Sequence, residues 1–136
     1  MEKKVQELSF HMKTLVQALS SLEEIFEENY SVIVRDATIQ RFEYTFELTW
    51  KFFRKVAKIE GIDPGSPRQA IRTAFQVGLL PEVDSWFELL ADRNRTSHTY
   101  SETTAEQVYE SAVRLPALLR PVIEQVTKTY LDEEMP

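Results

Sequence analysis

The chain has 136 residues, a formal net charge of −6 and no cysteine. The length suits one domain with a single core, and the absence of cysteine excludes disulfides, thiolate nucleophiles and cysteine-ligated metal sites. The negative charge excludes a strongly basic, nonspecific nucleic-acid binder and leaves at most a local basic patch, for which the candidates are Arg68, Arg72, Arg93 and Arg95.

Membrane and export signals are absent from the sequence. The first residues, MEKKVQE, lack the apolar core of a signal peptide, and no apolar run approaches the roughly 18 residues of a membrane-spanning helix. We therefore expect a soluble, cytoplasmic protein with no membrane partner. Only three glycines occur among many charged residues, a composition that favours helices over a sheet with many tight turns.

The first predicted element is an N-terminal helix with one narrow apolar seam. Its apolar residues recur at steps of three and four, the spacing of one helical face: Val5, Leu8, Met12, Leu15, Leu19, Leu22 and Phe26. Residues 29–31 (NYS) then predict a turn.

The second predicted element is the central helix, beginning at Ser31 or Asp36 and ending at Glu60, with Gly61 as its C-terminal cap. Apolar residues lie on two of its sides, so it should pack on both. Its polar strip includes Glu47 and Lys51, a favourably spaced pair. Its many aromatic side chains could leave apolar surface uncovered, which would suit a dimer.

Two short helices follow the central one. Ser66 is a predicted N-cap, Pro67 fits the first helical position, and Gln69 has the spacing of a capping box. Gly78 closes this helix, and Asp84 is the predicted cap of the next one, which carries an apolar face through Leu90.

The last predicted helix should begin at a capping box formed by Thr103 and Glu106. Pro116 and Pro121 lie inside it and should kink it, yet the apolar residues keep the spacing of one helical face across both prolines. We expect a single all-α domain over residues 1–136, an antiparallel, up-and-down bundle of about five helices, with residues 131–136 as a frayed tail.

Residues 92–100 (DRNRTSHTY) concentrate the groups that could bind phosphate or move a proton. If the preceding helix continued through them, Trp86, Leu90, Asn94 and His98 would share one side. The polar side chains would then continue a buried stripe and lie at an interface or a cleft floor. Buried polar groups need partners, so this arrangement would call for a ligand, a second subunit or an internal network.

Arg93 and His98 are five residues apart, about 140° around a regular helix. They can converge only if the helix ends near Ser97 or if the site is assembled from two chains. Asn94 and His98, four residues apart, could touch directly and fix the imidazole ring.

Histidine with arginine suits phosphodiester cleavage. The imidazole can move a proton at the 2′-hydroxyl or the leaving oxygen, and the guanidinium can bind the phosphate, so no metal is needed. The alternative interpretation is structural, because an arginine and a histidine in the last turn of a helix also cap its carbonyls and complement its dipole.

Three segments of the sequence, taken together in their order along the chain, resemble a known family. Residues 93–98 (RNRTSH) are similar to the R-x4-H motif of HEPN domains, and with Tyr100 they match its longer R-x4-H-x-Tyr form. Residues 41–51 (RFEYTFELTWK) resemble the central helix of the nucleotidyltransferase substrate-binding protein branch, which residues 66–72 (SPRQAIR) and 92–94 (DRN) also match. The resemblance extends from about Asp36 to Val126.

This resemblance implies an all-α bundle that forms a homodimer or higher assembly beside a minimal nucleotidyltransferase encoded nearby. In related toxin–antitoxin pairs the HEPN protein is a metal-independent ribonuclease whose site forms where two R-x4-H motifs meet. The partner uses ATP and magnesium to add AMP to the motif tyrosine. Carried over, the catalytic residues are Arg93, His98 and Asn94, the phosphate-binding residues are Arg93, Arg95 and Ser97, and the AMP acceptor is Tyr100; no cofactor or metal of its own is implied.

Two other functions remain open from the sequence. The branch takes its name from a substrate-binding domain, so the chain could be a non-catalytic subunit that holds a nucleotide or phosphorylated substrate for a two-component nucleotidyltransferase. It could also be a helical adaptor without a ligand.

Overall fold

Five α-helices account for most of residues 2–131, the part of the chain that the computed structural model describes. They are α1 (Glu2–Ile25), α2 (Val32–Ile59), α3 (Pro67–Gln76), α4 (Asp84–Arg93) and α5 (Glu102–Val126). A 3₁₀ turn, η1 (Thr96–His98), follows α4, and a π-helical turn, η2 (Thr127–Leu131), follows α5. The predicted all-α fold with five helices is confirmed, and no helix in the described residues is long and apolar enough to cross a membrane.

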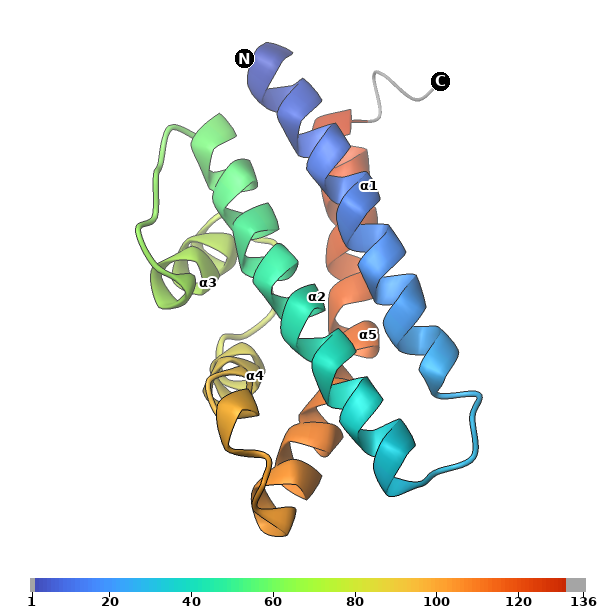
Figure 1. Ribbon diagram of the computed structural model, residues 1–136. Coiled ribbons are helices and arrows are strands. Elements are labelled where there is room, and N and C mark those ends of the chain that lie inside the picture. The colour runs from blue at the N-terminus through green and yellow to red at the C-terminus, as the bar shows by residue number, and fades with distance from the viewer. Residues whose placement is uncertain (1, 132–136) are drawn as a thin grey trace.

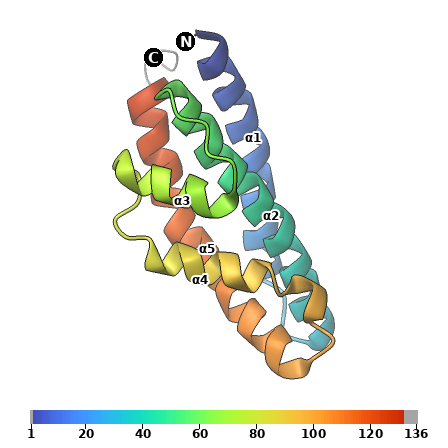
Figure 2. The same ribbon diagram turned by 90° about the vertical axis from the view of Figure 1, so that its left-hand side faces the viewer.

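The central position predicted for the second helix is confirmed. Helix α2 contacts α1 on one side and α3, α4 and α5 on others. Figure 1 shows α1 running antiparallel to α2, whereas α5 runs in the same direction as α2. The two short helices α3 and α4 lie across the long ones, as Figure 2 shows. Helix α4 therefore brings the polar residues that follow it to one face of α2.

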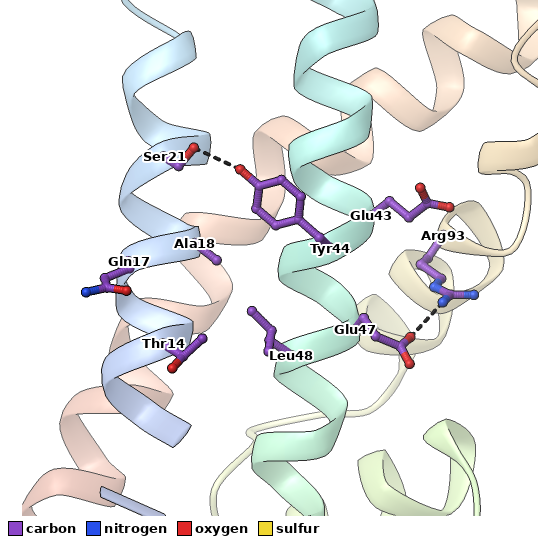
Figure 3. Close-up of a pocket in the computed structure, with 9 residues that line it drawn as sticks. All are labelled: Thr14, Gln17, Ala18, Ser21, Glu43, Tyr44, Glu47, Leu48 and Arg93. Atoms are coloured by element: carbon purple, nitrogen blue, oxygen red, sulfur yellow. Dashed lines mark hydrogen bonds and ion pairs between the residues drawn. The ribbon is translucent and has the colours of Figure 1, made fainter. Parts of the chain in front are cut away.

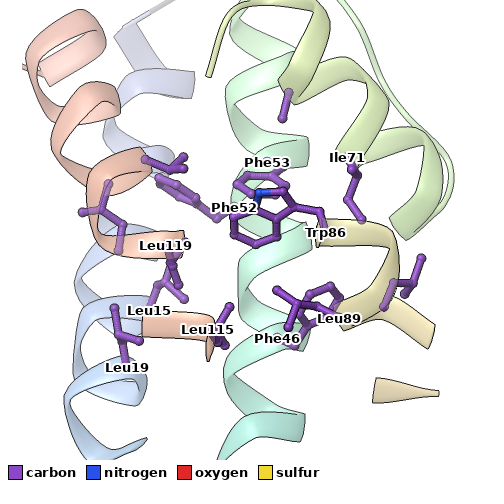
Figure 4. Close-up of a cluster of buried hydrophobic side chains, with 14 of the residues drawn as sticks. Leu15, Leu19, Phe46, Phe52, Phe53, Ile71, Trp86, Leu89, Leu115 and Leu119 are labelled. Atoms are coloured by element: carbon purple, nitrogen blue, oxygen red, sulfur yellow. The ribbon is translucent and has the colours of Figure 1, made fainter. Parts of the chain in front are cut away.

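The core fixes the short helices on α2 through large apolar side chains. Trp86 of α4 is 1% exposed, and its ring packs edge-on against Phe53 of α2 with centroids 5.2 Å apart. Figure 4 shows Ile71 and Leu89 beside this pair, with leucines of α1 and α5 on the other side of α2. Because these side chains are large and fully buried, the orientation of α4 is well determined by packing.

Several predicted helix ends are confirmed. The Ser31 hydroxyl accepts the Val34 N–H at 3.1 Å, so α2 begins at the earlier of its two predicted starts. Gly61 and Gly78 have φ of +84° and +87°, the left-handed conformation expected of glycine after a helix. Ser66 caps α3 as predicted.

Three predicted caps are wrong in detail. Gln69 accepts the Gly65 N–H, not that of Ser66, so its capping bond reaches one residue further back. Asp84 lies inside the first turn of α4, and the carboxylate of Glu82 accepts the Ser85 N–H instead.

The third correction concerns the start of α5. Ser101 is its N-cap, two residues before the predicted Thr103. The carboxylate of Glu106, predicted to complete a capping box, accepts the Tyr30 hydroxyl at 2.9 Å. This long-range bond to the segment before α2 replaces the local one.

Helix α5 continues through Pro116 and Pro121 as one helix, and Figure 1 shows it bending along its length. Each proline removes one backbone hydrogen bond, but the apolar residues on either side stay on the same buried face. The predicted frayed tail begins too early, because Leu131 is buried; residues 132–136 lie outside the described part of the chain.

Candidate active site

The polar segment 92–100 departs from helical geometry earlier than the sequence suggested. Helix α4 ends at Arg93, after which the Arg95 N–H bonds the Asp92 carbonyl and the His98 N–H bonds the Arg95 carbonyl, both three residues back. This tightening rotates the later side chains away from the apolar face of α4. Asn94 keeps the helical bond from its N–H to the Leu90 carbonyl and lines a hollow beside Leu90, whereas His98 lies beyond the tightened turns. Both side chains are exposed in the single chain, and the prediction that a buried stripe continues as far as His98 is wrong.

Arg93 points from the end of α4 toward α2. Its Nη2 donates to the Glu47 carboxylate at 2.6 Å, and its side chain is 31% exposed. Figure 3 shows this ion pair at one side of a shallow groove between α1 and α2, where Tyr44 bonds Ser21 across the gap. The Nε of Arg93 is buried and has no partner within residues 2–131, so the guanidinium keeps unused donor capacity.

Glu47 stays ionised beside Arg93. Burial raises the pKa of this carboxyl, but a hydrogen bond from Trp50 and the charges of Arg93 and Lys51 outweigh it and hold the pKa below its ordinary value. Lys51 lies 3.5 Å from the other oxygen of Glu47, which confirms the predicted pair. An anion that binds Arg93 must therefore share this guanidinium with a charged carboxylate.

Three further hydrogen bonds hold the segment in place. The Thr96 hydroxyl in η1 donates to Glu43 of α2 at 2.6 Å, and Asp92 accepts bonds from Ser111 of α5 and from Arg95. Sequence reasoning missed Glu43, Glu47 and Ser111 as members of this site. The two glutamates stood on the predicted polar strip of the central helix, but their spacing along one helix carries no information about partners 46 and 53 residues away.

His98 and Tyr100 form a second, outward-facing group. Their rings meet edge to face with centroids 6.0 Å apart, and Tyr100 is 84% exposed. Within the described residues, the imidazole of His98 has no hydrogen-bond or ion-pair partner. The predicted bond between Asn94 and His98 is absent there too. Ser97 is exposed, and Arg95 is tied to Asp92 at 2.8 Å.

The start of α5, directly after Tyr100, is anchored by a buried arginine. Arg35 of α2 is 3% exposed and bonds Glu102 at 2.7 Å as well as Asp36. The hydrogen bond from Arg35 holds the pKa of Glu102 below its ordinary value. The chain is therefore fixed at Thr96 and at Glu102, and His98 and Tyr100 are carried on the short loop between these two points.

The arrangement supplies an exposed imidazole and a guanidinium with unused donors, but no contact joins Arg93 to His98 within residues 2–131. Arg93 faces α2, and His98 faces outward with Tyr100. One chain thus presents the two groups separately. Among the described residues, no cluster of three or more His, Asp or Glu side chains is placed to hold a metal ion.

A family model shows the family of this chain, and similar proteins occur in two organisms. A family model described as "Nucleotidyltransferase substrate binding protein like" matches residues 10–126. A crystal structure of a Thermus thermophilus protein superposes with a TM-score of 0.77 and 37% sequence identity, covering 82% of this chain and 98% of that one. The probable ribonuclease HepT of Haemophilus influenzae is 33% identical over 76 residues, which is 52% of this chain and 52% of that relative. The aligned part therefore spans about half the length of this curated relative.

Proposed function

The chain belongs to the nucleotidyltransferase substrate binding protein like family of HEPN proteins, and from this premise we propose that it is a metal-independent endoribonuclease, the toxin half of a toxin–antitoxin pair. The single observation that carries the proposal is the placement of the R-x4-H residues. Arg93 retains an unused buried donor, and His98 is exposed and unbonded within the described residues. A relative named as a probable ribonuclease supports the same activity.

In the proposed reaction, His98 acts as the acid or base. As a base it takes the proton of a ribose 2′-hydroxyl, whose oxygen then attacks the adjacent phosphorus as the 5′-oxygen leaves; as an acid it gives a proton to that leaving oxygen. Arg93 donates to a non-bridging phosphate oxygen and stabilises the charge that develops there. Asn94, Arg95 and Ser97 would contact the RNA strand beside His98 and Arg93.

The proposal needs two chains. Since Arg93 and His98 do not meet in one chain, a homodimer or higher assembly would place the Arg93 of one subunit against the His98 of the other. The exposure of His98, Asn94 and Ser97 is consistent with surface that a second subunit and RNA cover together.

The proposed partner is a minimal nucleotidyltransferase encoded nearby, which would use ATP and magnesium to transfer AMP to the Tyr100 hydroxyl with release of pyrophosphate. Two observations support this acceptor. Tyr100 is the most exposed of the large hydrophobic and aromatic side chains in the described part of the chain, so an enzyme can reach it. Its ring lies against His98, so the added phosphate would stand beside the catalytic imidazole.

A non-catalytic role as the substrate-binding subunit of a two-component nucleotidyltransferase is the second candidate. One observation favours it: within residues 2–131 no carboxylate or carbonyl orients the His98 ring, whereas a general base is commonly held by such a group. In that case Arg93 would hold a nucleotide or phosphorylated substrate, and His98 would be dispensable.

The test is RNA cleavage by the purified protein in the presence of EDTA. We expect cleavage to continue after metal removal and to yield a 2′,3′-cyclic phosphate end, because the 2′-oxygen is the nucleophile. A protein that cleaves no RNA, but is required by the nucleotidyltransferase for transfer to a third molecule, would contradict the ribonuclease and support the binding subunit.

A further inference from the structure

Arg68 and Arg72 differ from the other arginines in the described part of the chain in their hydrogen bonding. The protein has nine arginines, and within residues 2–131 the side chains of seven bond a carboxylate or a backbone carbonyl: Arg35, Arg41, Arg54, Arg93, Arg95, Arg114 and Arg120. Arg68 and Arg72 of α3 form no ion pair or side-chain hydrogen bond there. In a protein with a net charge of −6, two exposed guanidiniums without a carboxylate partner call for an explanation.

Both guanidiniums lie over the ring of Phe87 on α4. The central carbon of Arg68 is 4.4 Å from the ring centroid, and that of Arg72 is 5.7 Å away. Arg68 and Arg72 are four residues apart on one face of α3, so both charges point to the same side. The aromatic ring holds the planar groups in place without using their N–H donors.

Arg68 and Phe87 line a hollow that reaches Asn94 of the R-x4-H motif, and Arg72 lies next to it over the same ring. The hollow lies between the start of α3 and the second half of α4, and its lining includes Arg68, Phe87, Leu90 and Asn94. Asn94 directly follows Arg93, so the hollow and the candidate active site are contiguous. Figure 2 shows α3 and α4 together on the face turned toward the viewer.

The chemistry of the hollow fits a phosphate group. Its lining combines apolar side chains such as Phe87 and Leu90 with the guanidinium of Arg68 and the amide of Asn94, and the second guanidinium, that of Arg72, lies beside the hollow over the Phe87 ring. At the start of α3, the Ser66 hydroxyl already accepts the Gln69 N–H and Pro67 has no N–H, so few backbone donors remain there. The guanidiniums are therefore the anion-binding groups, and both can bind phosphate oxygens in a bidentate manner.

We propose that Arg68 and Arg72 form a second phosphate subsite for the RNA strand, holding a phosphodiester next to the one at Arg93. This inference rests on the proposed ribonuclease function and extends the site by one binding position outside the R-x4-H motif. The subsite positions the strand and takes no part in the proton transfers. Its removal should weaken binding of RNA without changing the chemical step.

The test measures binding without cleavage. In the His98→Ala background, binding of a fluorescein-labelled single-stranded RNA is measured by anisotropy at several KCl concentrations, with and without Arg68→Ala/Arg72→Ala. We expect roughly tenfold weaker binding and a log–log salt slope shallower by about 0.7 to 1.4, because each phosphate contact on a single strand contributes about 0.7. The control is Lys3→Ala/Lys128→Ala, two exposed residues of α1 and η2 that give the same change in charge.

Each outcome decides the proposal. Equal affinity and slope in the Arg68/Arg72 variant and the lysine control overturn the subsite, as does a lack of RNA binding by the His98→Ala protein. Loss of ATP binding with unchanged RNA binding in the Arg68/Arg72 variant assigns the hollow to a free nucleotide and also overturns it. Cleavage by the wild-type protein is scored separately, so a failed nuclease assay with an intact binding effect removes the proposed function and leaves the subsite standing.

Discussion

Replacing His98 with alanine should lower the rate of RNA cleavage by roughly 10²–10⁴-fold, the contribution that a positioned acid or base makes. The fold should not change, because the His98 side chain is exposed and unbonded within the described residues. The measurement is the rate of RNA cleavage together with the thermal melting temperature of the variant. Thr103→Ala, another exposed position beyond Tyr100, is the matched control and should cleave at the wild-type rate. Cleavage by His98→Ala at that rate would contradict the assignment.

Arg93 requires a control of a different kind, because it both pairs with Glu47 and is proposed to bind phosphate. Arg93→Ala should abolish cleavage, but it also leaves the Glu47 carboxylate without its partner. Glu47→Gln separates the two roles, since it breaks the ion pair and keeps the guanidinium. If Arg93 acts on phosphate, Glu47→Gln should bind RNA at least as well as the wild type. If the ion pair alone matters, both variants should lose cleavage equally.

Incubation with the nucleotidyltransferase, ATP and magnesium should add one or more AMP units to the protein and stop RNA cleavage. The physical reason is the position of Tyr100, whose ring is 6.0 Å from that of His98, so AMP would bring bulk and negative charge to the place where RNA phosphate must lie. The measurement is intact mass together with cleavage rate.

Tyr100→Phe is the control for this modification. It removes only the hydroxyl of an exposed side chain, so it should cleave RNA near the wild-type rate and gain no AMP, and its cleavage should persist in the presence of the partner. An undiminished mass gain in Tyr100→Phe would place the acceptor elsewhere. A modified wild-type protein that still cleaves would contradict the silencing role.

The fold was predictable because its signals are local and repeated. The apolar steps of α1 and the two-sided pattern of α2 extend over many turns, and Ser31, Gly61, Ser66 and Gly78 mark helix ends through their own backbone chemistry. The predictions of caps at Asp84 and Thr103 were wrong because neighbouring or distant groups form the hydrogen bonds there. The Glu82 carboxylate, and not that of Asp84, accepts the Ser85 N–H. The Glu106 carboxylate accepts the hydroxyl of Tyr30, which is 76 residues away in the sequence.

The site was predictable as a set of residues but not as a geometry. The motif from Arg93 to Tyr100 could be identified from the sequence, whereas the end of α4 at Arg93 could not. No glycine or proline marks that end, and the turn is held by Thr96 on Glu43 and by Asp92 on Ser111. Such pairings depend on packing between helices, which periodicity along one helix does not encode.

The central claim is that Arg93 and His98 act together across two chains, and mixing the two inactive variants tests it most directly. Arg93→Ala and His98→Ala proteins are unfolded and refolded together, so that mixed dimers form, and RNA cleavage is compared with that of each variant refolded alone. A mixed dimer contains one site with both wild-type residues, so random pairing should restore up to about a quarter of the wild-type rate. Mixtures that cleave no faster than the separate variants would contradict the two-chain site.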